Sequence, residues 1–147
     1  MPIKSFRGKI AHDTVEQINL ATNNGSTGYR IKKFEIMSSN MNEDVEHSMK
    51  IFSVPQTTAL TSFDFSDPTL LAAAFMRVTK GNAPGFQDVI VTFDNITFNQ
   101  DIFVTHDDVG GSAVACNYHI ELEQVKLDLN ENTVATLKDI RNITEPT

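Results

Sequence analysis

The stretch from Thr105 to Glu123 contains the residue types that could do chemistry. It holds two histidines, two adjacent aspartates, two glutamates and the only cysteine of the chain. Imidazole, carboxylate and thiolate groups bind transition metals, and they also act as acids, bases and nucleophiles. The stretch is therefore either a metal or catalytic site, or a β-hairpin whose polar residues face water.

Strand geometry favours the hairpin. Successive strand residues point to opposite faces, so Cys116 and His119 cannot share a metal ion. The segment Asp-Asp-Val-Gly-Gly, centred near Val109 and Gly110, predicts the turn and places His106 at the hairpin tip. We expect Cys116 to be a small buried hydrophobic residue, packed between the last strand and its hairpin partner.

The opposite face of the same strand carries His119, Glu121 and Glu123. A metal-dependent β-barrel enzyme would use His119 and Glu121, but such sites need a paired H-x-H with further ligands, and the sequence has no such pair. A calcium loop would need the spacing D-x-D-x-D-G, which is absent. We therefore expect this face to be solvated or to lie at an interface, with no metal and no cofactor bound.

Other catalytic patterns are missing as well. The sequence has no G-x-S-x-G, P-loop, C-x-x-C, H-E-x-x-H or G-x-G-x-x-G motif. His12 in "AHDT" and His47 in "NEDVEH" lie beside carboxylates, as surface histidines often do, and neither has a nucleophile in evident reach. We expect a protein without enzymatic activity and without catalytic or cofactor-binding residues.

Composition narrows the class of partner. The net charge is −7 and the basic residues are scattered, which argues against direct nucleic-acid binding. Ten Phe, two Tyr and no Trp favour core packing over exposed platforms for sugars or bases. The single cysteine excludes an intrachain disulfide. No segment has signal-peptide character or the roughly 20 apolar residues of a membrane span, which predicts a soluble protein made in a cytoplasm.

Short alternating segments separated by turn residues dominate the chain and predict strands. The segment Tyr29 to Met37 changes phase once, which indicates a β-bulge or a bend between sheets. The segment Asp64 to Val78 favours a turn followed by a strand, with a helix over residues 69–78 as the alternative. Further strands are expected at Glu16 to Thr22, His47 to Val54 and Ala113 to Leu129.

Asp94 and Asn95 tolerate positive φ and predict a second, two-residue hairpin. That turn would place Phe93 opposite Ile96 and Val91 opposite Phe98. Near the C-terminus, a narrow apolar stripe predicts a short helix at about residues 131–142. The pattern predicts one all-β domain over residues 1–147, an antiparallel β-sandwich of jelly-roll type with a short C-terminal helix.

Several segments resemble small virion structural proteins of tailed phages, particularly those of marine and cyanobacterial viruses. In chain order these segments are "GYRIKKFEIM", "DFSDPTLLAAAF", "NQDIFVTHDD" and "CNYHIELEQVKLDLNENTVATLKDIRN". The resemblance implies a capsid- or tail-associated assembly protein, and it assigns no catalytic residue.

These observations together favour a non-enzymatic virion structural protein, made in the host cytoplasm and assembled in many copies as a capsid decoration or cement protein. The alternatives are a tail component and a receptor- or glycan-binding β-sandwich. Expected partners are copies of the same chain and other virion proteins, with no direct contact to nucleic acid or membrane. Apolar residues near both termini are the candidate inter-subunit contacts, namely Ile3, Phe6, Ile10, Val134, Leu137 and Ile140.

A sandwich has edge strands that must be blocked from pairing with another chain, and the sequence offers few blocking residues. The segment "VIVTFDNITF", from Val89 to Phe98, has no internal Lys or Pro. Lys32 and Lys33 are in a position to protect another strand.

Overall fold

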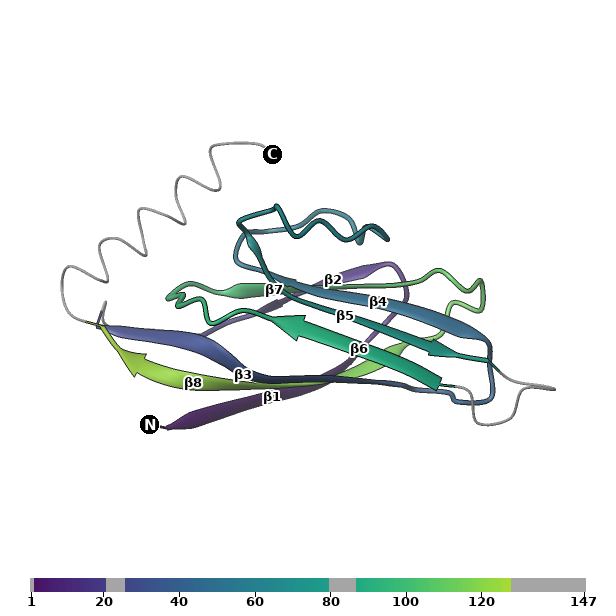
Figure 1. Ribbon diagram of the computed structural model, residues 1–147, viewed down its shortest axis with the longest axis horizontal. Coiled ribbons are helices and arrows are strands. Elements are labelled where there is room, and N and C mark those ends of the chain that lie inside the picture. The colour runs from purple at the N-terminus through teal and green to yellow at the C-terminus, as the bar shows by residue number, and fades with distance from the viewer. Residues whose placement is uncertain (1, 21–25, 80–86, 128–147) are drawn as a thin grey trace.

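A computed structural model describes residues 2–20, 26–79 and 87–127 of the chain. This part of the chain consists of eight strands: β1 (Ile3–Ile10), β2 (Thr14–Ile18), β3 (Thr27–Ser38), β4 (Val45–Phe52), β5 (Leu70–Val78), β6 (Gln87–Phe93), β7 (Ile102–Asp108) and β8 (Cys116–Lys126). They form two antiparallel sheets packed face to face (Figure 1), which confirms the predicted all-β sandwich. The expected helix at 131–142 lies outside the described residues.

The strand order has the nested pairing of a jelly roll. The small sheet has the order β1-β8-β3, and the large sheet has the order β2-β7-β4-β5-β6. Thus β1 pairs with β8, β2 with β7, and β4 with β5. The remaining nested pair would be β3 with β6, but β6 pairs with β5 instead. In the described part of the chain, Phe98, which lies beyond the end of β6, forms an isolated bridge with Tyr29 of β3.

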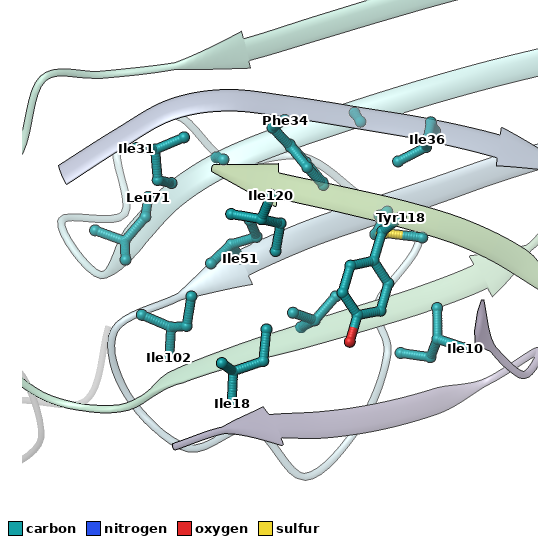
Figure 2. Packing of buried hydrophobic residues seen from close by; sticks show 14 of the residues in the cluster. Ile10, Ile18, Ile31, Phe34, Ile36, Ile51, Leu71, Ile102, Tyr118 and Ile120 are labelled. Carbon is teal, nitrogen blue, oxygen red and sulfur yellow. The ribbon is translucent and has the colours of Figure 1, made fainter. Parts of the chain in front are cut away.

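The core lies between the two sheets. Along β8, alternate side chains point inward, and Cys116, Ile120 and Leu122 have no exposed surface. Figure 2 shows Ile120 in the same buried cluster as Ile51 and Ile102 of the large sheet. Burial of these apolar side chains supplies most of the stabilisation of such a sandwich. Among the described residues, no helix is suited to crossing a lipid bilayer.

Two local predictions are confirmed. The phase change in β3 is a register shift between Ile31 and Lys33 along the pairing with β8. Residues 70–78 form strand β5, because hydrogen bonding to β4 on one side and β6 on the other overrides the helix propensity of its alanines. The turn before β5 is held by Asp67, whose carboxylate accepts hydrogen bonds from the backbone and hydroxyl of Thr69.

Both predicted hairpins are wrong. Strand β7 lies between β2 and β4 in the large sheet, whereas β8 lies between β1 and β3 in the small sheet. The chain between Asp108 and Cys116 is therefore a crossover from one sheet to the other. The hairpin predicted at Asp94 and Asn95 does not form either, because Val91 pairs with Ala74 of β5 and Phe98 pairs with Tyr29. Alternation identifies a strand and its buried face, but it does not identify the strand's partner.

Candidate functional site

An apolar groove lies on the outer face of the large sheet. Its sheet side is formed by β5 and β6, where Phe75 pairs with Ile90 and Ala73 pairs with Thr92. Its other wall comes from the connection between β4 and β5, which arches over the sheet in Figure 1. The groove has a volume of about 320 Å³ and is lined by Phe63, Phe65, Ala73, Ala74, Phe75, Ile90 and Thr92.

The groove is exposed although its lining is apolar. Phe65 is 71% exposed and Ile90 is 62% exposed. The outer face of a sheet in a soluble protein is normally polar. Contiguous exposed apolar patches commonly mark surfaces that bind another molecule. This groove is therefore a candidate binding surface.

Lys50 of β4 fixes the wall of the groove. Its amine donates hydrogen bonds to the carbonyl oxygens of Leu60, at 2.6 Å, and Ser62. The same amine lies 5.1 Å from the centre of the Phe63 ring, a cation–π contact. Burial lowers the pKa of the Lys50 amine, and the negative charge of Asp107 opposes that shift. Lys50 thus holds the connection, with its two phenylalanines, against the sheet.

Strand β6 continues the groove to the edge of the sheet. It is the last strand of the large sheet in the part of the chain that the structure describes. Between Val89 and Phe93 it contains no charged residue and no proline, the residues that natural edge strands use to prevent pairing with other chains. Part of the segment that lacks a blocking Lys or Pro in the sequence thus forms the edge strand of the large sheet.

A second candidate site is buried inside the sandwich. His47 of β4, His106 of β7 and Cys116 of β8 have no exposed surface. One potential ligand atom from each lies within 4.8 Å of those of the other two. Since β4 and β7 belong to the large sheet and β8 to the small sheet, this histidine–cysteine cluster spans the core.

Hydrogen bonding fixes the tautomers of the two histidines. Nδ1 of His106 lies 3.0 Å from the carbonyl oxygen of Ala11, which can only accept, so Nδ1 carries the proton. Nε2 of His106 then accepts the hydrogen bond from Nδ1 of His47, at 2.8 Å. Nε2 of His47 is left with a lone pair that finds no hydrogen-bond partner among the described residues. Such a buried unsatisfied group costs about 1–3 kcal/mol.

Burial keeps all three side chains of this cluster uncharged. It lowers the pKa of His47 to about 4, helped by the neighbouring His106, and it also lowers the pKa of His106. Burial raises the pKa of the Cys116 thiol to about 12, so the free thiol is a poor nucleophile at neutral pH. By itself the cluster is thus suited to accepting a ligand through lone pairs rather than to nucleophilic catalysis.

Two histidines do not lie where the sequence analysis predicted. His106 was expected at a hairpin tip and His47 on the surface, but both are core residues. The alternation of side chains along each strand could have revealed this burial. His47 lies on the same strand face as the buried residues Val45 and Met49, and His106 lies on the same face as buried Val104. A histidine in phase with a buried apolar series points inward.

Cys116 is buried as predicted, although its neighbours differ from those expected. It pairs with Ile10 of β1 and Ser38 of β3, not with a residue of β7. On the outer face of β8, Glu123 forms an ion pair with Arg30, at 2.9 Å. His119 pairs in register with Glu35 of β3 and is partly exposed, on the face opposite Cys116.

The candidate inter-subunit contacts differ in how exposed the structure leaves them. Ile10 is fully buried in the protein's own core, so it is not available to another subunit. Phe6 packs partly against the same core, whereas Ile3 is 48% exposed. Strand β1, which carries all three, pairs with β8, a partner that the sequence did not reveal. Val134, Leu137 and Ile140 lie outside the described residues.

Comparison of the chain with protein-family models, with curated proteins and with solved structures finds no match. The function must therefore be inferred from the residues and geometry of this chain.

Proposed function

We propose that the protein is a non-enzymatic virion structural protein that assembles in repeated copies, as a capsid decoration protein of a tailed phage. The observation that carries the proposal is the apolar groove, which runs without interruption into the unprotected edge strand β6. An exposed apolar surface next to an edge strand without blocking residues favours pairing with another chain.

A second copy of the same chain is the occupant that best fits this surface. An antiparallel strand can pair with an identical strand across a two-fold axis, because each presents the same backbone donors and acceptors. Pairing of β6 with β6 would join the two large sheets edge to edge. Ile90 of each copy would then lie near the junction, and the two apolar grooves would share one continuous face.

Fold and sequence add weaker support for a virion protein. Jelly-roll sandwiches occur in viral capsids and also in lectins and cupins, so the fold argument is an analogy only. The segments that resemble phage virion proteins include all of β3 except its end residues, most of β5, and the whole of β7 and β8. A role in the tail is the alternative within the same class.

The self-association step can be tested by sedimentation of the purified chain over a range of concentrations. We expect a concentration-dependent dimer or larger oligomer, and we expect Ile90→Asn to shift it toward monomer. Ile90 is exposed, so this change should leave the fold intact. Met37→Asn is the matched control, since Met37 is also exposed and apolar but lies on β3 of the small sheet. A wild-type chain that stays monomeric at every concentration would contradict the proposed contact.

The virion assignment needs a separate experiment, namely mass spectrometry of purified particles with an estimate of copy number. Hundreds of copies per particle would support a capsid location, and a few or dozens would favour the tail. Absence of the chain from the particles would overturn the virion assignment, even if the purified chain associates with itself.

A further inference from the structure

We propose that His47, His106 and Cys116 bind one thiophilic metal ion, Zn²⁺ or Cu⁺, which cross-links the two sheets inside the core. The three side chains come from β4, β7 and β8 and converge so that their potential ligand atoms lie within 4.8 Å of one another. This inference is independent of the proposed virion function and of the groove on the outer face.

The donor set selects the kind of metal. Two imidazoles and one thiolate suit Zn²⁺ and Cu⁺, whereas Mg²⁺ and Ca²⁺ require oxygen ligands. No carboxylate belongs to this cluster of described residues. Cu⁺ accepts three ligands and would need nothing further, while Zn²⁺ would add a water as its fourth ligand.

The surroundings of His106 match those of a metal ligand. A metal-bound histidine usually donates its second ring N–H to a carbonyl or carboxylate, which fixes the ring and its tautomer. Nδ1 of His106 already makes such a bond to the carbonyl of Ala11, at 3.0 Å. Its Nε2 lone pair consequently faces the cluster.

The unpartnered atom of His47 is the second observation that points to a ligand. His47 is fully buried, and its Nε2 lone pair has no hydrogen-bond partner among the described residues. Coordination would satisfy a polar group that the protein alone leaves unsatisfied. A buried polar atom that fails to find a partner is the kind of exception that a missing ion explains.

Binding requires the hydrogen bond between the two histidines to open and a balanced proton exchange. His47 would bind through its free Nε2 lone pair and keep its proton on Nδ1, and His106 would bind through Nε2, the atom that otherwise accepts the hydrogen bond from His47. The hydrogen bond between the rings opens, and the His106 lone pair turns to the metal. The Cys116 thiol releases its proton to solvent as the metal–sulfur bond forms, and each imidazole binds in its neutral form.

The purified, reduced chain can be titrated with Co²⁺ as a spectroscopic probe for the Zn²⁺ site, and with Cu⁺ under anaerobic conditions. We expect one ion per chain and a thiolate-to-cobalt charge-transfer band. Because the chain has a single cysteine, that band can arise only from Cys116. X-ray absorption of the zinc-loaded wild-type chain should show one sulfur and two imidazoles, a readout that requires no variant to fold.

Bound Zn²⁺ or Cu⁺ should raise the melting temperature of the wild-type chain. His47→Gln and Cys116→Ala should abolish both the charge-transfer band and this rise. His119→Gln is the matched control, because His119 lies on the outer face of β8, and it should change neither. Absence of both the cobalt band and stoichiometric Cu⁺ binding, or a metal that binds without raising the melting temperature, would overturn the proposal. Sedimentation with and without metal would show that self-association is a separate property.

Discussion

The hydroxyl of Tyr118 donates a hydrogen bond to the carboxylate of Glu16 across 3.2 Å. Tyr118 belongs to β8 in the small sheet and Glu16 to β2 in the large sheet, so this bond links the two sheets through a mostly apolar core. Tyr118 is only 8% exposed. Burial and the nearby carboxylate together raise the pKa of its phenol to about 12.

The raised pKa predicts how stability depends on alkaline pH. The folded-state pKa exceeds the unfolded value of about 10, so the contribution of Tyr118 is fully present below pH 10 and is lost as the pH rises through 12. We expect a contribution of about 1–3 kcal/mol. The measurement is phenolate absorbance against pH, with Tyr118→Phe subtracted to isolate this residue. Glu16→Gln should lower the pKa, and a Tyr118 phenolate at pH 10 in the folded protein would contradict the argument.

Replacement of Gly8 by alanine should destabilise the small sheet. Gly8 pairs with Tyr118, and a Cβ at this position would lie 2.9 Å from the phenolic oxygen and 3.1 Å from the adjacent ring carbon. The buried ring has little room to shift, so we expect a loss of about 1–3 kcal/mol in the free energy of unfolding. Urea denaturation would measure it.

The clash also predicts a coupling between the two positions. In the Tyr118→Phe background, Gly8→Ala should cost less, because the atom closest to the new methyl group is gone. Equal losses in both backgrounds would show that the contact with Tyr118 is not the cause.

Asp108 should be essential to the crossover between the sheets. It is 2% exposed, and its carboxylate accepts backbone hydrogen bonds from Glu46, Gly110 and Val114 at 2.9–3.0 Å. Asp108→Ala would leave these amides without their acceptor, and we expect a loss of about 2–5 kcal/mol. Denaturant unfolding would measure the loss, and hydrogen exchange at 109–115 should become faster.

Asp64→Ala is a suitable control for Asp108. Asp64 also accepts a backbone hydrogen bond, from Ser66 at 3.0 Å, but it lies in an exposed turn. Its replacement should cost less than about 1 kcal/mol, since water can replace the lost partner. A similar small effect at Asp108 would mean that the crossover does not depend on its carboxylate.

The Cys116 thiol should react slowly with bulky reagents in the native, metal-free protein. It has no exposed surface, and burial raises its pKa to about 12. Cys116→Ser should lower the free energy of unfolding by about 1–3 kcal/mol, because the hydroxyl would be poorly satisfied beside Ile10. Thiol-labelling kinetics in a chelator would test the burial, and rapid labelling below the unfolding transition would refute it.

The expectation that no metal binds rested on the opposite faces of Cys116 and His119 and on the missing H-x-H pair. It put His106 at a solvent-exposed turn and compared Cys116 only with His119, on the same strand. The comparison with His119 was sound, since the two residues lie on opposite faces of β8. The placement of His106 was wrong, because the structure brings potential ligand atoms of His106 and His47 within 4.8 Å of the Cys116 sulfur.

The sequence by itself determined most of the strands and several of their buried faces. Side-chain alternation is a local property, which is why the inward series of β8, the bulge in β3 and the burial of Cys116 were all predictable. The C-terminal helix at 131–142 stays a prediction.

Only the tertiary structure decided which strands pair and which side chains meet. In this nested topology β1 pairs with β8 and β2 with β7, across almost the whole chain, so pairing reflects a sum of distant contacts rather than the nearest turn. The turn residues Asp108 to Gly111 suit a hairpin and a crossover equally well, and the buried carboxylate of Asp108 stabilises the crossover. The meeting of His47, His106 and Cys116 follows from this packing, because strands from opposite sheets become neighbours only when the sandwich closes.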